Sequence, residues 1–172
     1  IDIAKWLRYE GEYKWSNISP NIDTNLLYIA FKNGKVDMIQ WMIDDGHQPL
    51  NDRFYSEHIY TVVVDGIIES VKLCITKGVK LTYDLMAAAA ATNNTKMLTF
   101  LKESNCDCHR DFLYPAAIYG YINVFIWAEE NNMEWSNVKC LRKAIKHNDT
   151  NNKNLPVIEW LLERISGERD CI

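Results

Sequence analysis

The chain has 172 residues, of which 48% are hydrophobic and 24% charged, a composition that excludes wholesale disorder. Its formal net charge of −4 provides no overall positive field for nucleic acid or anionic lipid. The longest apolar run, Leu85 to Ala91, is far shorter than the ~20 residues that a membrane span needs. We therefore expect neither a nucleic-acid nor a membrane partner.

The predicted elements are helix pairs, taken here in chain order. Residues 1–18 predict half a repeat, namely a second helix whose first helix is missing. Full repeats, each a first helix, a tight turn and a second helix, are predicted over about 19–50, 51–81, 82–108, 109–136 and 137–172. The last repeat fits this frame if its turn carries an insertion near residues 149–153, where the sequence is polar.

One large residue recurs in the second helix of each repeat and defines the frame. These anchors are separated by 35, 32, 27, 27 and 33 residues: Trp6, Trp41, Leu73, Phe100, Trp127 and Trp160. Residues that tolerate a helix C-cap follow four or five positions later at Gly11, Gly46, Gly78, Asn105 and Asn132. We expect Trp41, Trp127 and Trp160 in the core. Trp15 and Trp135 fall outside the frame and either cover the stack or are exposed anchors.

The first helices carry a small residue four positions before their turn residue. The small residues are Ala30, Val62, Ala89, Ala116 and Ala144, and the turn residues are Gly34, Gly66, Asn93, Gly120 and Asn148. Small side chains let two antiparallel helices approach closely, so they predict the seam of each pair. Apolar residues of the second helices recur at intervals of three and four, which is helical periodicity. One pair cannot bury its own apolar face, so the pairs must stack.

The phrases Tyr28-Ile-Ala-Phe-Lys-Asn-Gly34, Met38-Ile-Gln-Trp-Met-Ile-Asp-Asp-Gly46 and Pro115-Ala-Ala-Ile-Tyr-Gly120 resemble the ankyrin repeat. The resemblance covers nearly the whole chain and implies an all-α solenoid. The family's T-P-L-H turn is absent, and gaps of 27 residues are shorter than its period of about 33, so short or irregular hairpin loops are expected. HEAT, armadillo and tetratricopeptide arrays are the competing solenoids. The version with Trp in the second helix looks like the ankyrin arrays of large DNA viruses and some protists.

The cysteines and histidines are the candidate residues for metal binding or catalysis. Cys106, Cys108 and His109 are the only metal-like cluster, but zinc needs four ligands and no second pair exists. No cysteine has the base and orienting group that a nucleophile requires, and there is no glycine-rich phosphate loop. We expect no enzyme activity, no cofactor, no metal and no small-molecule substrate. The odd number of cysteines, five, favours reduced thiols in an intracellular, cytoplasmic protein, although N-x-S/T sequons at Asn17, Asn93 and Asn148 argue against it.

Another protein is the expected partner, because solenoids bind along a concave face and loop tips. The resemblance places recognition just before the turn between helices, at Lys32, Asn33, Val64, Asp65, Ala91, Thr92, Ile118, Tyr119, Lys146 and His147. It also places recognition at the expected starts of first helices, at Thr24, Ser56, Tyr83 and Arg110. Tyr83, Arg110 and Tyr119 are the expected hot spots, since aromatic and Arg side chains dominate interface energies. A viral protein that engages host factors would fit the prediction of a protein-binding solenoid. The alternatives are a structural segment of a longer array and an enzyme centred on Cys106, Cys108 and His109.

Overall fold

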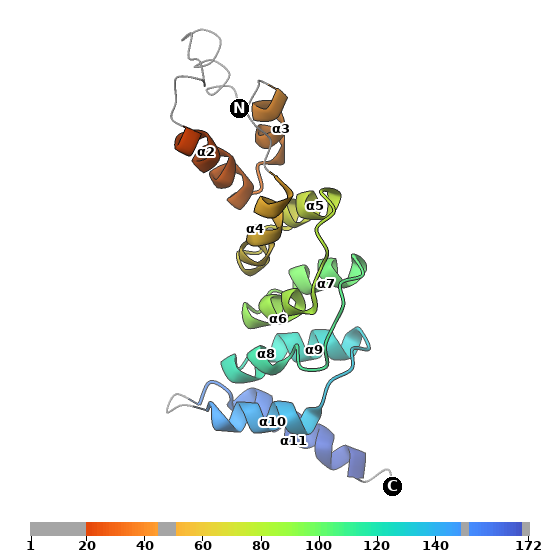
Figure 1. Cartoon of the computed structure of the whole chain (residues 1–172). Helices are drawn as coiled ribbons and strands as arrows, with labels where there is room; N and C mark the ends of the chain where they lie inside the picture. The colour runs from red at the N-terminus through yellow and green to blue at the C-terminus, as the bar shows by residue number, and fades with distance from the viewer. Residues whose placement is uncertain (1–19, 45–50, 149–151, 170–172) are drawn as a thin grey trace. The chain divides into compact units, whose positions relative to one another are not determined.

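The computed structural model describes residues 20–44, 51–148 and 152–169 (Figure 1). Within these ranges all regular secondary structure is helical. In chain order the helices are α2 Pro20–Lys32, α3 Val36–Asp44, α4 Asp52–Val64, α5 Ile68–Thr76, α6 Tyr83–Ala91, α7 Thr95–Glu103, α8 Tyr114–Tyr119, α9 Ile122–Glu130, α10 Asn137–Lys146 and α11 Leu155–Arg169. The all-α prediction is confirmed for these ranges, and the links 77–82, 104–113 and 131–136 contain no β-hairpin. The predicted half-repeat over 1–18, with Trp6, Gly11 and Trp15, lies outside the described residues, as does Gly46.

The chain divides into two compact units, Ile1–Lys80 and Leu81–Ile172. In the first unit α2 packs on α3, α4 packs on α5, and α3 contacts α5. In the second unit the pairs are α6 with α7, α8 with α9 and α10 with α11. There α6 contacts α8, α8 contacts α10, and α7 contacts α9, so the pairs stack in chain order (Figure 1). In each pair we call the earlier helix (α2, α4, α6, α8 or α10) the first helix and the later one (α3, α5, α7, α9 or α11) the second helix. The grouping of all pairs into one domain stays a prediction.

One hydrogen-bond pattern closes the turn inside each of the first four pairs. The residue after the turn donates its backbone N–H to the carbonyl of the small seam residue, as from Lys35 to Ala30 at 2.9 Å and from Tyr121 to Ala116 at 2.9 Å. This bond is the six-to-one contact of a Schellman cap and needs a left-handed residue within the turn. The predicted turn residues provide it, with φ of 67°, 77°, 55° and 77° at Gly34, Gly66, Asn93 and Gly120. The same cap, with positive φ at Gly78, Asn105 and Asn132, ends α5, α7 and α9.

In the fifth pair a side chain reaches the seam carbonyl. Among the described residues of this turn Asn152 has a positive φ, 52°, whereas the predicted turn residue Asn148 does not. The fully buried Asn154 donates its side-chain Nδ2 to the carbonyl of the seam residue Ala144 at 3.2 Å.

The core follows the predicted seam but not the predicted anchor residues. All five seam residues are at most 3% exposed. Of the five anchors within the described residues only Trp127, at 6% exposure, is buried, whereas Trp41, Leu73, Phe100 and Trp160 are half-buried. The prediction that Trp41 and Trp160 are core residues is therefore wrong. The buried stripe falls one residue later, at Met42, Cys74, Leu101, Ala128 and Leu161, each 0% exposed.

Two of the anchors, Trp127 and Trp160, contact the neighbouring second helix. Trp127 of α9 donates its indole Nε1 to the Thr99 hydroxyl of α7 at 2.9 Å. The Trp160 ring of α11 lies 5.8 Å, centroid to centroid, from Phe125 of α9. In the second unit these two aromatic side chains therefore link successive pairs.

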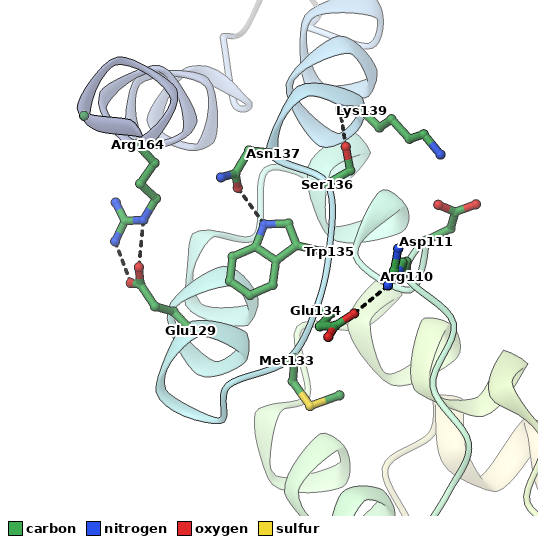
Figure 2. A pocket seen from close by; sticks show the side chains of 11 residues that line it. Arg110, Asp111, Glu129, Met133, Glu134, Trp135, Ser136, Asn137, Lys139 and Arg164 are labelled. Atoms are coloured by element: carbon green, nitrogen blue, oxygen red, sulfur yellow. Dashed lines mark hydrogen bonds and ion pairs between the residues drawn. The ribbon is translucent and has the colours of Figure 1, made fainter. Parts of the chain in front are cut away.

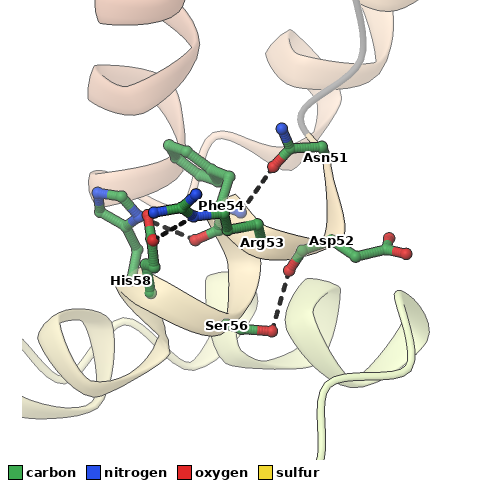
Figure 3. A network of polar contacts seen from close by, with 7 residues as sticks. Asn51, Asp52, Arg53, Phe54, Ser56 and His58 are labelled. Atoms are coloured by element: carbon green, nitrogen blue, oxygen red, sulfur yellow. Dashed lines mark hydrogen bonds and ion pairs between the residues drawn. The ribbon is translucent and has the colours of Figure 1, made fainter.

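The start of α4 carries a network of polar contacts (Figure 3) and, beside it, an aromatic cluster. Asn51 caps this helix, its side-chain oxygen accepting the Phe54 backbone N–H at 2.8 Å. The Phe54 ring stacks on His58 at 4.3 Å and meets Phe31 edge-on at 5.3 Å. Tyr55, at 0% exposure, packs against Phe31, and its hydroxyl has no hydrogen-bond partner among the described residues. Burial raises the pKa of this hydroxyl above its usual value of 10.0.

Candidate protein-binding surface

Large apolar side chains are exposed on every first helix. Six of the nine exposed large hydrophobic residues among the described residues lie there, between 47% and 56% exposed: Ile29, Tyr60, Tyr83, Tyr119, Val138 and Ile145. The remaining three, Ile126, Leu155 and Leu162, lie on the second helices α9 and α11. Exposed apolar side chains that recur on one member of each pair mark that member as the side available to a partner.

In the first unit the structure joins two of the predicted recognition residues. Lys32, the last residue of α2, forms an ion pair with Asp65 at 3.6 Å, across the ends of two successive first helices. Asn33 is exposed but is bound to its own turn, because its side-chain amide donates to the Ile29 carbonyl at 2.7 Å. Val64 is half-buried. Thr24 lies inside α2, but its side chain is not among those that the structure describes.

In the second unit the predicted residues have different surroundings. Tyr83 is the first residue of α6 and is 56% exposed, with its ring centroid 6.0 Å from that of His109. Tyr119, the last residue of α8, is 47% exposed, whereas Ile118 is half-buried. Thr92 is exposed and closes the end of α6, its hydroxyl donating to the Ala89 carbonyl at 3.1 Å. Ala91 is half-buried, and Lys146 and His147 are exposed at the end of α10.

Three of the predicted helix starts are wrong. Thr24 lies one turn inside α2, which begins at Pro20. Ser56 lies one turn inside α4, because Asn51 caps the helix earlier. Arg110 lies in a turn before α8, which begins only at Tyr114. Pro115 at the start of α8 disfavours helix in the residue before it and lacks an N–H, so it suits the first turn and no later position. Arg110 is therefore a loop residue and is free to face the next link of the chain.

Arg110 lines an open groove of about 1090 Å³ within the second unit (Figure 2). The groove runs past the link between α9 and α10 and reaches α11; its walls include Arg110, Glu129, Met133, Trp135, Lys139 and Arg164. Trp135, which the repeat frame does not explain, is half-buried here, and its indole Nε1 donates to the Asn137 side-chain oxygen at 2.8 Å. In Figure 2 its ring lies in the groove with an ion pair on either side.

These two ion pairs bridge successive repeats. Arg110 contacts Glu134 at 2.8 Å, and Arg164 of α11 makes bidentate contacts of 3.0 and 2.6 Å with Glu129 of α9. The Arg164 guanidinium also stacks on Trp160, 3.2 Å from the ring centroid. Its hydrogen bonds lower the pKa of Glu129 below the usual 4.5. The Arg110–Glu134 pair is exposed and should contribute little to stability, whereas the Arg164 side chain is only 29% exposed.

The cysteine cluster does not converge on one point. Cys106 is buried with Sγ 3.4 Å from the Thr82 carbonyl oxygen, and burial raises its pKa to about 11. Cys108 is exposed, and its Sγ lies 3.7 Å from the His109 carbonyl oxygen. Among the described residues no three His, Cys, Asp or Glu side chains are grouped to hold a metal ion. A thiol that stays protonated at neutral pH is a poor nucleophile.

Sequence reasoning overlooked several exposed residues, of which Val138, Ile145 and Tyr60 are the clearest. Cys140 and Ala144 fix the buried side of α10, so helical periodicity alone places Val138 and Ile145 on the opposite side. The groove was not foreseeable in the same way, because its walls come from residues as far apart as Arg110 and Arg164.

Comparison of the chain with family models, with curated proteins and with solved structures found no match. Within the described residues there is also no helix of the length and apolarity needed to cross a bilayer.

Proposed function

We propose that this protein binds another protein through the exposed sides of its first helices, in the manner of an ankyrin-like array. The single observation that supports the proposal most is the recurrence of an exposed large apolar residue on each first helix. Water around such side chains is released when a partner covers them, which is the main favourable term in association. The second helices α3, α5 and α7 expose no residue of this kind among their described positions.

The proposed surface in the second unit centres on Tyr83 and Tyr119. Both are rigid aromatic side chains with a polar tip, a type that makes large contacts at low cost in conformational entropy. Tyr119 has the Tyr121 ring 5.7 Å away, which limits its motion before binding. A hot-spot residue of this kind contributes at least about 2 kcal/mol, or roughly thirty-fold in affinity.

Site-specific photo-crosslinking tests this function. A photoreactive phenylalanine analogue replaces Tyr119, and a matched control carries it at Ile126, an exposed apolar position on the second helix α9. In extract of cells that naturally contain the protein, we expect a discrete crosslinked partner from position 119 only. Excess unlabelled protein should compete, whereas a Tyr83→Ala/Tyr119→Ala double variant should compete at least about thirty-fold less well. Equal crosslinking from both positions, or equal competition by the double variant, would refute the proposal.

A further inference from the structure

Helix α10 differs from the other first helices in what it exposes. Val138 and Ile145 are 53% and 55% exposed, and seven residues apart they share one side of the helix. Half-buried Leu141 lies beside them. Cys140 and Ala144, both 0% exposed, occupy the opposite side, where α10 packs on α8 and α11. The exposed apolar residues of α10 are thus a strip, which we call the apolar strip.

A row of unneutralised cations runs beside the apolar strip. Lys139, Arg142 and Lys146 are exposed, and none of them forms an ion pair with a described residue. We call these three residues the cation row. The fourth cation of the helix, Lys143, lies over the Tyr114 ring at 5.4 Å. The sequence of α10, NVKCLRKAIK, contains no acidic residue.

Several other cations of the same unit have a partner. Arg110 and Arg164 each face a glutamate, and Lys102 donates to the Asn131 carbonyl at 2.8 Å. Three acids line the groove beside Lys139. Glu129 and Glu134 are already engaged by those arginines, and Asp111 lies 3.6 Å from the His109 ring nitrogen. Asp111 is a single carboxylate against the three cations of the row, so the potential over α10 stays positive, although the whole chain is negative at −4.

At 100° per residue, the apolar strip and the cation row occupy adjacent halves of one exposed helix face. We propose that α10 docks an acidic amphipathic helix of the partner protein, with apolar side chains against the strip and carboxylates against the row. This inference rests on the proposed function and specifies the chemistry of the partner. A helix laid along another helix matches both rows at once, since both repeat at intervals of three, four and seven.

Phosphate and lipid ligands fit this face less well. A nucleic-acid backbone would neutralise the cation row but leave Val138 and Ile145 in water. Helices that lie on membranes bury broad faces rich in Trp, Phe and Leu, whereas two branched side chains form most of the strip here. An acidic helix uses the whole face, and the charges would also accelerate and orient its approach.

A fluorescent synthetic peptide of about four helical turns tests the inference. Its leucines line one side and its glutamates the adjacent side, and a matched control peptide carries glutamine in place of glutamate. Binding is measured by anisotropy on the whole chain. We expect the glutamine peptide to bind at least about tenfold more weakly, equivalent to about 1.4 kcal/mol. Arg142→Glu and Ile145→Ser should each weaken the glutamate peptide by a similar factor.

Lys96→Glu is the matched control protein, because Lys96 is an exposed cation of the same unit on the second helix α7. It should bind the glutamate peptide as the natural chain does, and all three variants should retain the native circular dichroism spectrum. Equal affinity for both peptides, or equal loss with Lys96→Glu, would overturn the inference. The inference would also be overturned if neither peptide bound while phosphatidylserine vesicles or a single-stranded RNA bound in an Arg142-dependent way. The RNA should be about 20 nucleotides long, which exceeds the usual single-strand site.

The two proposals can fail separately. If crosslinking from position 119 captures a competed partner but neither peptide binds, the assignment of an acidic helix to α10 is wrong and the protein-binding function stands. If peptide binding follows the expected pattern but position 119 captures nothing, the inference for α10 stands and the proposed surface around Tyr119 does not.

Discussion

Replacing Gly120 with alanine should destabilise the protein by more than its backbone angle alone requires. Gly120 ends α8 in the left-handed conformation, with φ of 77°. A Cβ atom there would lie 2.3 Å from the Lys153 carbonyl oxygen and 3.0 Å from the Asn154 side-chain oxygen. Gly78 is a natural control, because its φ is 80° but a Cβ atom would meet nothing within 4 Å.

The two substitutions separate backbone strain from steric overlap. An L-residue in the left-handed region costs about 1–2 kcal/mol, partly offset by about 0.4–1 kcal/mol from the lower entropy of the unfolded chain. Gly78→Ala should therefore cost roughly 0–1.5 kcal/mol. Gly120→Ala adds overlap with backbone atoms that cannot rotate away, for which overpacking of about 1–3 kcal/mol is the appropriate comparison. The expected total at Gly120 is about 1–4.5 kcal/mol.

Urea denaturation followed by far-UV circular dichroism measures the free energy of unfolding of each variant, and tryptophan fluorescence provides a second probe. The reasoning would be refuted by equal losses at the two glycines. That result would mean that the turn between α8 and α9 does not pack against the turn between α10 and α11.

Three further predictions concern the core and the thiols. Ala116→Leu should lower the free energy of unfolding by about 1–3 kcal/mol in the same denaturation assay, because Ala116 is 0% exposed at the seam; an unchanged value would place the seam elsewhere. Tyr55→Phe should be neutral or stabilise the protein by up to about 1 kcal/mol, since it removes a buried hydroxyl without a partner, and a clear loss of stability would reveal a hidden bond. Cys108 is exposed, so it should react with maleimide in the native state, although slowly because desolvation raises its pKa to about 11; Cys74 and Cys140 are buried, with pKa raised to about 12, and should react only after unfolding, as peptide mapping by mass spectrometry can show.

The local sequence was sufficient to predict the helix pairs and their turns. Gly34, Gly66, Asn93 and Gly120 mark turns because few other residues tolerate positive φ, and this constraint acts on one residue at a time. The seam was predictable for a similar reason, since a small residue is needed wherever two helices approach closely. Neither inference depends on knowing which other repeat lies alongside.

Errors arose where a neighbouring repeat or an insertion decided the outcome. Trp160 recurs in frame and was therefore predicted to lie in the core, yet it is half-buried beside Phe125 of another pair. The turn of the fifth pair was predicted to reverse at Asn148, but Asn152 adopts positive φ and the Asn154 side chain caps the Ala144 carbonyl. Periodicity identifies the face of a helix but does not say how deeply a neighbour covers it.

The sequence by itself therefore determined the helical class, the pairing of helices, the turn positions of the first four pairs and the small residues between helices, because these follow from backbone conformation and local side-chain size. Only the tertiary structure decided which side chains meet across repeats. The pairs Lys32–Asp65 and Arg110–Glu134 and the groove around Trp135 each depend on residues brought together from separate turns of the chain. The proposed binding surface belongs to this second class.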